Sequence, residues 1–267
     1  MALIQVNFVS NTLRRTVPLQ VILPVDRLTD DWQSAEPKKF KTLYLLHGIF
    51  GNYTDWVSGT RIQRWAQKYD LAVVMPSGDN AFYIDHPATG NLYGEFIGHE
   101  LVDITRRMFP LSDKREDTFI GGLSMGGYGA VRNGLKYHET FGAIISFSGA
   151  LHFLDDPQLL SDETDPVDRV FMESMFGPLK EAGKSDKNPS VLIEKLGKQK
   201  AADLSLKLPK VYITCGTEDD LLPSNRSCRD RMLANGFQVT YEEGPGGHDW
   251  DFWDAYILKA LQWLAQL

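Results

Sequence analysis

The chain has 267 residues, of which 43% are hydrophobic and 24% charged, and its formal net charge is -7. These proportions are those of a globular protein and argue against a disordered chain, a collagen-like repeat or a coiled coil. The acidic balance disfavours nucleic acid or an anionic membrane as the main partner, because both are bound through clustered Lys and Arg. We therefore expect a small-molecule partner.

The cysteines and the apolar runs indicate in which cellular compartment the protein is expected. Cys215 and Cys228 are too few for a disulfide framework, and their spacing fits no four-ligand zinc pattern. Residues 1–11 lack the regions of a signal peptide, and no apolar run approaches the roughly 18 residues of a membrane-spanning helix. We expect a cytoplasmic protein with reduced thiols, no bound metal and no membrane partner.

The predicted elements begin with a hairpin, in which residues 3–10 and 16–23 are extended around a polar turn, and a polar loop follows at 30–39. Short apolar runs without alternation suit strands buried on both faces. They cover residues 42–46, 71–75, 118–120, 143–147 and 211–214. Helix-like stretches cover residues 61–69, 94–109, 125–137 and 225–235. This alternation predicts an α/β fold with a mostly parallel sheet flanked by helices and joined by right-handed crossovers.

One segment in the second half of the chain departs from this alternation of strands and helices. Residues 151–208 lie between two strand runs and are longer than an ordinary crossover, with predicted helices at 165–176 and 190–199. We interpret them as a helical insertion over the carboxyl edge of the sheet, where open α/β folds bind ligands. A peripheral decoration without substrate contact is the alternative. Residues 250–264 predict an amphipathic terminal helix, and we expect a single domain over 1–267.

The strongest local motif is Gly122-Leu123-Ser124-Met125-Gly126, a G-x-S-x-G sequence that follows a strand run and opens a helix-like run. In that context the serine sits on a sharp, strained turn, and small residues two positions to either side avoid collision with the adjoining strand and helix. A glycine-rich turn without chemistry is the alternative, because the bare motif is common by chance. We expect Ser124 to be a nucleophile.

A serine hydroxyl is a poor nucleophile at neutral pH and needs a general base. His248 stands on a glycine-rich loop after the extended residues 237–242 and before the terminal helix, from which it can reach Ser124. We predict His248 as the base. The histidines without a comparable context are His86, His99, His138 and His152. His47 precedes Gly48 at the end of an early strand, where another role fits better.

The imidazole needs an acid that holds its tautomer and stabilises its charged form. Glu218, Asp219 and Asp220 follow the strand run 211–214, which places an acidic loop at the same edge of the sheet. We choose Asp219, although the sequence separates the three poorly and each could instead be a charge ahead of a helix. The chain order of serine, acid and histidine is that of the α/β-hydrolases.

Acyl transfer also requires backbone donors for the oxyanion. The first is typically the amide after the nucleophile, here Met125, and the second comes from the loop after the third strand. Residues 47–52 follow the run 42–46 at that place. We expect the Ile49 amide to be the second donor, with Phe50 as the fallback.

Together these motifs resemble the esterase D-like branch of the α/β-hydrolase superfamily, and the similarity covers most of the chain. The matching segments are Leu45-Leu46-His47-Gly48, Gly122-Leu123-Ser124-Met125-Gly126-Gly127, Gly216-Thr217-Glu218-Asp219 and Gly247-His248-Asp249-Trp250. The branch includes tributyrin esterases, S-formylglutathione hydrolases, feruloyl and acetylxylan esterases, and mycolyltransferases. By the family pattern the acid is Asp219, three residues after Gly216.

Residues 75–83 help to distinguish the subfamilies within this branch. They lack the stretches that the resemblance leads us to expect in S-formylglutathione hydrolases, which disfavours that group. Residues 80–83, with 93–101 after them, look most like the intracellular tributyrin esterases. Mycolyltransferases are secreted and normally have glutamate as the acid, so they fit less well.

The sequence thus predicts a serine carboxylesterase that hydrolyses short-chain acyl esters through an acyl-enzyme intermediate, without a metal or organic cofactor. Acetyl or feruloyl esterase activity on plant polysaccharide fragments, and thioesterase activity, are alternatives. Transfer of the acyl group to a sugar and a catalytically silent binding fold are further rivals. Aromatic side chains that could wall an acyl pocket, or instead belong to the core, are Phe50, Trp56, Phe82, Tyr83 and Trp250. Homo-oligomerisation stays open.

Overall fold

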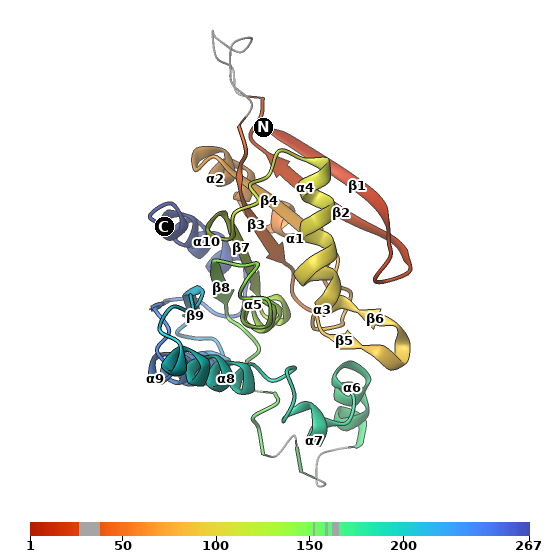
Figure 1. Cartoon of the computed structure of the whole chain (residues 1–267), viewed down its shortest axis with the longest axis vertical. Helices are drawn as coiled ribbons and strands as arrows, with labels where there is room; N and C mark the ends of the chain where they lie inside the picture. Colours follow the sequence, from red (N-terminus) through yellow and green to blue (C-terminus); the bar gives the residue numbers. More distant parts are fainter. Residues whose placement is uncertain (27–37, 152, 158–159, 162–165) are drawn as a thin grey trace.

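The computed structural model describes residues 1–26, 38–151, 153–157, 160–161 and 166–267 (Figure 1). The polar loop expected at 30–39 lies outside the described residues except for its last two. Within the described chain the main sheet has eight strands in the order β1-β2-β4-β3-β7-β8-β9-β10. Their bounds are β1 Ala2–Ser10, β2 Arg15–Leu23, β3 Lys41–Leu46, β4 Leu71–Pro76, β7 Thr118–Leu123, β8 Ala143–Phe147, β9 Lys210–Gly216 and β10 Val239–Gly244.

The strand directions confirm the predicted α/β class. β1 and β2 form the expected hairpin, paired antiparallel from Ala2 opposite Leu23 to Ser10 opposite Arg15. β2 also pairs antiparallel with β4, whereas the pairs from β4 through β3, β7, β8 and β9 to β10 are parallel. The carboxyl ends of six strands therefore meet at one edge of the sheet.

The apolar runs were expected to be buried on both faces, and the structure confirms this. Along β3, Leu43 and Leu45 join one apolar cluster, whereas Tyr44 and Leu46 join the cluster on the opposite face. This alternation follows from the two-residue period of a strand. Helices α1 Asp55–Gly59, α2 Ile62–Lys68 and α10 Trp250–Leu264 pack on the first face, and α4 Leu101–Met108, α5 Met125–Lys136 and α9 Leu222–Ala234 on the second.

Most predicted helices are confirmed, with some differences in extent. α9 begins at Leu222, three residues before the predicted start, because Pro223 is favourable in the first turn of a helix. The stretch 94–109 is divided into α3 Tyr93–Glu95, a π-helical segment Phe96–Glu100 and α4. Elements too short to show a periodicity were not predicted. They are α1, β5 Asp85–His86, η1 Pro87–Thr89, β6 Asn91–Leu92, η3 Arg115–Asp117 and α7 Leu179–Ala182.

The insertion predicted at 151–208 contains α6 Pro166–Phe176, α7 and α8 Pro189–Ala202. It is anchored to α5, the helix that follows Ser124: the Tyr128 hydroxyl donates to the Lys187 carbonyl, and Arg132 Nε donates to the Asp186 carbonyl at 3.1 Å. In Figure 1, α6 and α7 lie at the lower end of the molecule, beyond the end of β3. Contact between the insertion and substrate, and the single-domain organisation, stay predictions.

Candidate active site

Ser124 occupies a strained turn between β7 and α5. Its backbone angles are φ 52° and ψ -118°, a left-handed conformation that a residue with a Cβ rarely adopts. Its amide donates to the Phe147 carbonyl at 2.9 Å, and its carbonyl accepts from the Tyr128 and Ala150 amides. The surrounding backbone therefore holds the turn in place and presents the hydroxyl at the carboxyl edge of the sheet.

The two motif glycines are required by close backbone contacts, as the motif predicted. A Cβ on Gly122 would stand 2.5 Å from the carbonyl carbon of Gly126, and a Cβ on Gly126 would stand 2.5 Å from the carbonyl oxygen of His47. Real Cβ atoms do not approach backbone this closely. The turn therefore brings β7, α5 and the loop after β3 together only when both positions lack a side chain.

We expect Gly126→Ala to lower the free energy of unfolding by about 1–3 kcal/mol, because its methyl group must push apart two backbone segments. Urea denaturation measures this change. Gly121→Ala is the matched control, since its nearest obstacle is the Ile145 side chain at 3.2 Å and no backbone atom lies closer than 3.6 Å. Equal destabilisation by the two substitutions would contradict the close-contact account.

Ser124, His248 and Asp219 lie in one hydrogen-bonded chain. His248 Nε2 is 2.9 Å from Ser124 Oγ, and His248 Nδ1 is 2.9 Å from Asp219 Oδ2. Ser124 follows β7, Asp219 follows β9 and His248 follows β10, so the three meet because parallel strands end at the same edge. The Trp253 ring packs edge-on against the imidazole at 5.0 Å and limits its rotation.

The Asp219 carboxylate is buried and accepts several hydrogen bonds. Burial by itself would raise the pKa of Asp219, but the hydrogen bonds from His248, from the Leu221 amide and from Ser148 outweigh it and lower that pKa below its usual value. Asp219 is therefore ionised at neutral pH. It can hold the imidazole with Nδ1 protonated and Nε2 free to accept the serine proton.

Ser148 was missed by the sequence analysis. It directly follows β8, adopts a left-handed φ of 46°, and its buried hydroxyl accepts from Trp253 Nε1 at 3.3 Å. Because it also supports the Asp219 carboxylate, it links the acid to the tryptophan that packs on His248. A polar residue immediately after a buried strand run was the available signal, the same one that pointed to Asp219.

The neighbouring acids make other contacts. Glu218 accepts from the Gly246 amide and from the Thr217 hydroxyl, and Asp220 is exposed. Three of the other histidines also have partners outside the site. His86 contacts the Thr89 hydroxyl, His99 the Glu95 carboxylate and His138 the Leu135 carbonyl, and His152 lies outside the described residues.

The hydrogen bonds of the loop after β3 distinguish the Ile49 amide from the Phe50 amide as the second oxyanion donor. The Phe50 amide already donates to Asn80 Oδ1 at 2.8 Å, which removes the fallback. Within the described part of the chain, no group accepts a hydrogen bond from the Ile49 amide or the Met125 amide. Met125 is the first residue of α5, where backbone amides lack intrahelical partners and the helix dipole favours negative charge.

Two of the five aromatic candidates belong to the core, which is one of the two roles that the sequence left open. Trp56 and Tyr83 are 1% and 0% exposed, so neither can wall a pocket that opens to solvent. Trp56 Nε1 donates to the Leu46 carbonyl, while the Tyr83 hydroxyl donates to the His47 carbonyl.

The other three aromatic candidates differ in exposure. Phe82 is buried against Phe176 of α6, with ring centroids 4.8 Å apart, and Trp250 is partly buried edge-on against Trp56. Phe50 is 81% exposed and has a left-handed φ of 65°. Phe50 is therefore the candidate most open to a bound substrate.

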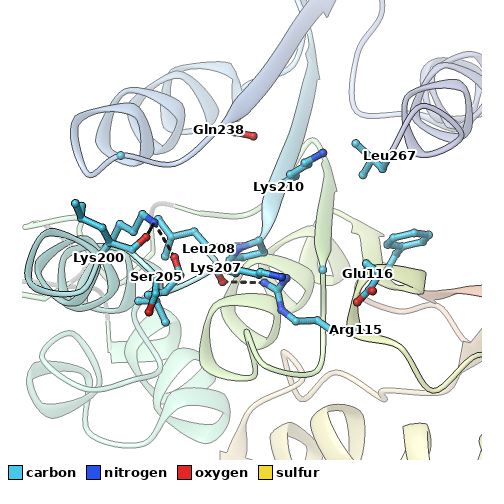
Figure 2. Close-up of a pocket in the computed structure, with 15 residues that line it drawn as sticks. Arg115, Glu116, Lys200, Ser205, Lys207, Leu208, Lys210, Gln238 and Leu267 are labelled. Atoms are coloured by element: carbon cyan, nitrogen blue, oxygen red, sulfur yellow. Dashed lines mark hydrogen bonds between the residues drawn. The ribbon is translucent and has the colours of Figure 1, made fainter.

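A cavity of about 500 Å³ lies at the opposite edge of the sheet, near the amino end of β9 (Figure 2). Arg115 and Lys200 line it, but their nitrogens already donate to backbone carbonyls: Arg115 to Lys207, and Lys200 to Leu204 and Leu206. Because Ser124 is at the carboxyl edge, this cavity has no part in the site described above.

The described residues contain neither a metal-ligand cluster nor a membrane-spanning helix. No cluster of three or more His, Cys, Asp or Glu side chains there could hold a metal ion. Nor does any helix in the same part of the chain have the length and apolar character to cross a bilayer.

The fold is that of the α/β-hydrolases. It has a mostly parallel eight-stranded sheet with helices on both faces, and serine, acid and histidine lie on loops at the carboxyl edge. The family model described as "Putative esterase" matches residues 10–264. The chain belongs to this esterase family, and it is an enzyme that hydrolyses carboxylic esters.

Individual relatives are similar over the whole chain. An acetyl esterase of Caldicellulosiruptor saccharolyticus is 42% identical over 269 aligned residues, covering 100% of this chain and 99% of its own. Serine hydrolase F of Staphylococcus aureus, solved with substrate bound, has a TM-score of 0.82 at 32% identity, covering 99% of this chain and 98% of that one. An S-formylglutathione hydrolase from Staphylococcus aureus has a TM-score of 0.81, with the same identity and coverage.

Proposed function

We propose that the protein hydrolyses short-chain acyl esters, acetyl esters foremost, with Ser124, His248 and Asp219 as its catalytic triad. The observation that carries the proposal is the unbroken hydrogen-bonded chain from Asp219 through His248 to Ser124, with both contacts at 2.9 Å. This is the distance over which a general base takes a proton from a nucleophile. The similarity to an acetyl esterase supports the short acyl group.

In this mechanism His248 Nε2 takes the proton of Ser124 Oγ as the oxygen attacks the ester carbonyl carbon. The Ile49 and Met125 amides donate to the oxyanion of the tetrahedral intermediate. His248 then gives the proton to the leaving alcohol, and the acyl group stays on Ser124. Water then attacks the carbonyl carbon of the acyl-enzyme while His248 takes a proton from it. The second tetrahedral intermediate collapses, the carboxylic acid leaves, and Ser124 Oγ takes the proton back from His248.

The pH dependence of kcat/KM follows from these protonation states. Since the pKa of Asp219 is lowered, Asp219 keeps its negative charge as the pH falls from neutral, and the proton that matters for activity is the one that passes between Ser124 and His248. A protonated His248 cannot accept the serine proton, so activity is lost as pH falls. We expect kcat/KM to decrease about tenfold per pH unit on the acidic side. A profile that is flat between about pH 5 and about pH 9 would contradict the assignment of His248 as the base.

A cavity beside the oxyanion loop is our candidate for the subsite of the leaving alcohol. This cavity of about 270 Å³ lies between residues 79–93 and α6. Its lining includes Asp79, Asn80, His86, Asn91 and the exposed Phe171. Asn80 also holds the Phe50 amide, so this cavity adjoins the oxyanion loop. The carboxylate, amide and imidazole groups in this lining can hydrogen-bond a hydroxyl-bearing alcohol, which supports acetyl esters of saccharides as substrates.

Thioester hydrolysis is the second candidate, because the same triad accepts thioesters and a similar solved structure is an S-formylglutathione hydrolase. The higher identity to the acetyl esterase, 42% against 32% for the S-formylglutathione hydrolase, favours ester hydrolysis as the first candidate. Acyl transfer to an added sugar or alcohol is distinguished by its transacylated product.

The substrate experiment compares p-nitrophenyl esters from acetate to decanoate with methyl ferulate, acetylated xylo-oligosaccharide and an acetyl thioester matched to an acetyl ester. We expect the highest kcat/KM on acetate or butyrate, release of acetate from the saccharide, and slower cleavage of decanoate and ferulate. A preference for the thioester over its matched ester would favour the second candidate. No cleavage of any ester would contradict the proposal.

We also propose a cytoplasmic location and a small-molecule ester as the main partner, with no nucleic-acid partner. The net charge of -7 speaks against a nucleic-acid partner, and the two buried free cysteines support the cytoplasmic location. Fractionation of cells that express the chain from its own gene tests the location. Recovery of the protein outside the cytoplasm would contradict it.

A further inference from the structure

We propose that His47 is a positioning residue for the oxyanion hole: its neutral imidazole fixes the peptide between Gly48 and Ile49 so that the Ile49 amide faces the reacting carbonyl. The inference rests on the proposed function, because it concerns the same site. His47 is not in contact with His248 or Asp219, and the hydrolysis mechanism leaves it without a task. The structure nevertheless buries it to 1% exposure directly beside the oxyanion loop.

The hydrogen bonds of His47 define its tautomer. Nδ1 lies 2.6 Å from the Gly48 carbonyl oxygen, which can only accept, so Nδ1 must carry the proton. Nε2 lies 2.9 Å from the Gly78 amide nitrogen, which can only donate, so Nε2 must be unprotonated. His47 is therefore the neutral Nδ1-protonated form. Burial lowers its pKa and supports that state.

The geometry of one peptide unit connects His47 to the reaction. The Gly48 carbonyl and the Ile49 amide belong to the same planar trans peptide, so the two groups point in opposite directions. The carbonyl is held by His47 Nδ1 and, at 3.3 Å, by the Gly51 amide. With the carbonyl fixed on that side, the Ile49 amide is fixed on the other.

That other side is next to the nucleophile. A Cβ added to Gly48 would stand 3.6 Å from Ser124 Cβ, so the 48–49 peptide lies beside the catalytic serine. The Ile49 amide has no acceptor among the described residues, as a group reserved for a bound oxyanion requires. Without the His47 bond, the peptide could rotate and its amide would leave this direction.

The imidazole is itself held from a different part of the chain. Gly78 lies in the loop after β4, and from the same loop Tyr83 packs edge-on against the imidazole at 5.7 Å and donates its hydroxyl to the His47 carbonyl. Gly78 must be glycine there, because a Cβ would collide with the Tyr83 ring. The loop after β4 thereby braces the loop after β3 through His47.

Two substitutions separate the two hydrogen bonds. In His47→Gln the side-chain amide reaches the position of Nε2 and can accept from Gly78, but the donor to Gly48 is lost. In His47→Asn the shorter amide reaches the position of Nδ1 and can donate to Gly48, but the bond to Gly78 is lost. Tyr44→Phe is the control, since Tyr44 lies in β3, the strand before His47, and the substitution removes a buried 2.8 Å hydrogen bond to Thr105 away from the site.

The readouts are kcat and KM on p-nitrophenyl acetate, the inhibition constant of a trifluoromethyl ketone whose oxyanion occupies the hole, and the free energy of unfolding. We expect His47→Gln to lose about 10- to 100-fold in kcat, less than complete loss of an oxyanion donor, with KM nearly unchanged. The inhibition constant should rise in parallel. His47→Asn should retain most of the kcat even if it is less stable than His47→Gln.

Three results would overturn the proposal. The first is a wild-type kcat in His47→Gln, and the second is a kcat that follows stability alone across His47→Gln, His47→Asn and Tyr44→Phe. The third is a wild type that hydrolyses no ester, which would overturn the proposed function as well. An active wild type that loses its activity in Ser124→Ala supports the triad independently, so a failure of the His47 proposal is recognisable by itself.

Discussion

Replacement of Ser124 by alanine is expected to abolish ester hydrolysis while leaving the fold intact. Loss of the serine in a comparable triad costs about a million-fold in kcat, and at least about a thousandfold should be measurable here. The residual rate would come from the oxyanion donors and from substrate binding. The fold should persist because the strain at residue 124 resides in its backbone, which alanine shares with serine.

The assay is hydrolysis of p-nitrophenyl acetate by wild type and variant at equal folded concentration. Ser146→Ala is the matched control, since Ser146 lies in β8 and its buried hydroxyl has no hydrogen-bond partner among the described residues. It should keep wild-type kcat. A Ser124→Ala enzyme with more than about a thousandth of the wild-type activity would remove Ser124 from the nucleophile role.

Asp219→Asn is expected to lower kcat by about ten-thousandfold with little change in KM. The asparagine amide can donate to His248 Nδ1, which would then have to accept, so the proton would move to Nε2. In that tautomer Nε2 cannot take the proton of Ser124 Oγ. The variant keeps the shape of the side chain and tests the tautomer specifically.

Glu218→Gln and Asp220→Asn are the controls for Asp219, because they make the same change on its two neighbours. Neither neighbour contacts His248, so both variants should retain kcat within a few fold. Steady-state kinetics on all three variants gives the comparison. A loss in Asp220→Asn as large as that in Asp219→Asn would reassign the acid.

The sequence predicted those parts of the site that depend on local geometry. A serine on a strained turn needs glycine at 122 and 126 within the same short segment, so the motif carries its own structural reason. The strand ends were predictable for a similar reason, because short apolar runs mark buried parallel strands. Asp219, chosen from three adjacent acids with support from the family pattern, is the one in contact with His248.

The parts that the sequence left open depend on contacts between distant segments. Ile49 was the preferred oxyanion donor and Phe50 the fallback, and it is Asn80, thirty positions from Phe50, that occupies the Phe50 amide. For Trp56 the sequence left a pocket wall and the core open, and the structure buries its indole in the core, where it donates to the Leu46 carbonyl. Residue type and proximity to a motif do not determine which way an aromatic side chain points.

For Ser148 and His47 the position in the fold was predictable from the sequence, but the role was not. Both follow the end of a buried strand, a position that the sequence identified correctly, but their roles depend on the groups placed opposite them. For Ser148 these are Asp219 and Trp253, and for His47 they are the Gly48 carbonyl and the Gly78 amide. Only the assembled sheet edge brings these groups together.

Covalent labelling tests the central claim most directly, namely that Ser124 is a nucleophile activated by His248 and Asp219. The wild-type protein is treated with an alkyl fluorophosphonate, digested and analysed by mass spectrometry, with Ser124→Ala and His248→Ala treated alongside. We predict one adduct per chain, on the peptide that contains Ser124, no adduct in Ser124→Ala and much slower labelling of His248→Ala. An adduct on another residue, or an unlabelled wild-type enzyme, would contradict the account.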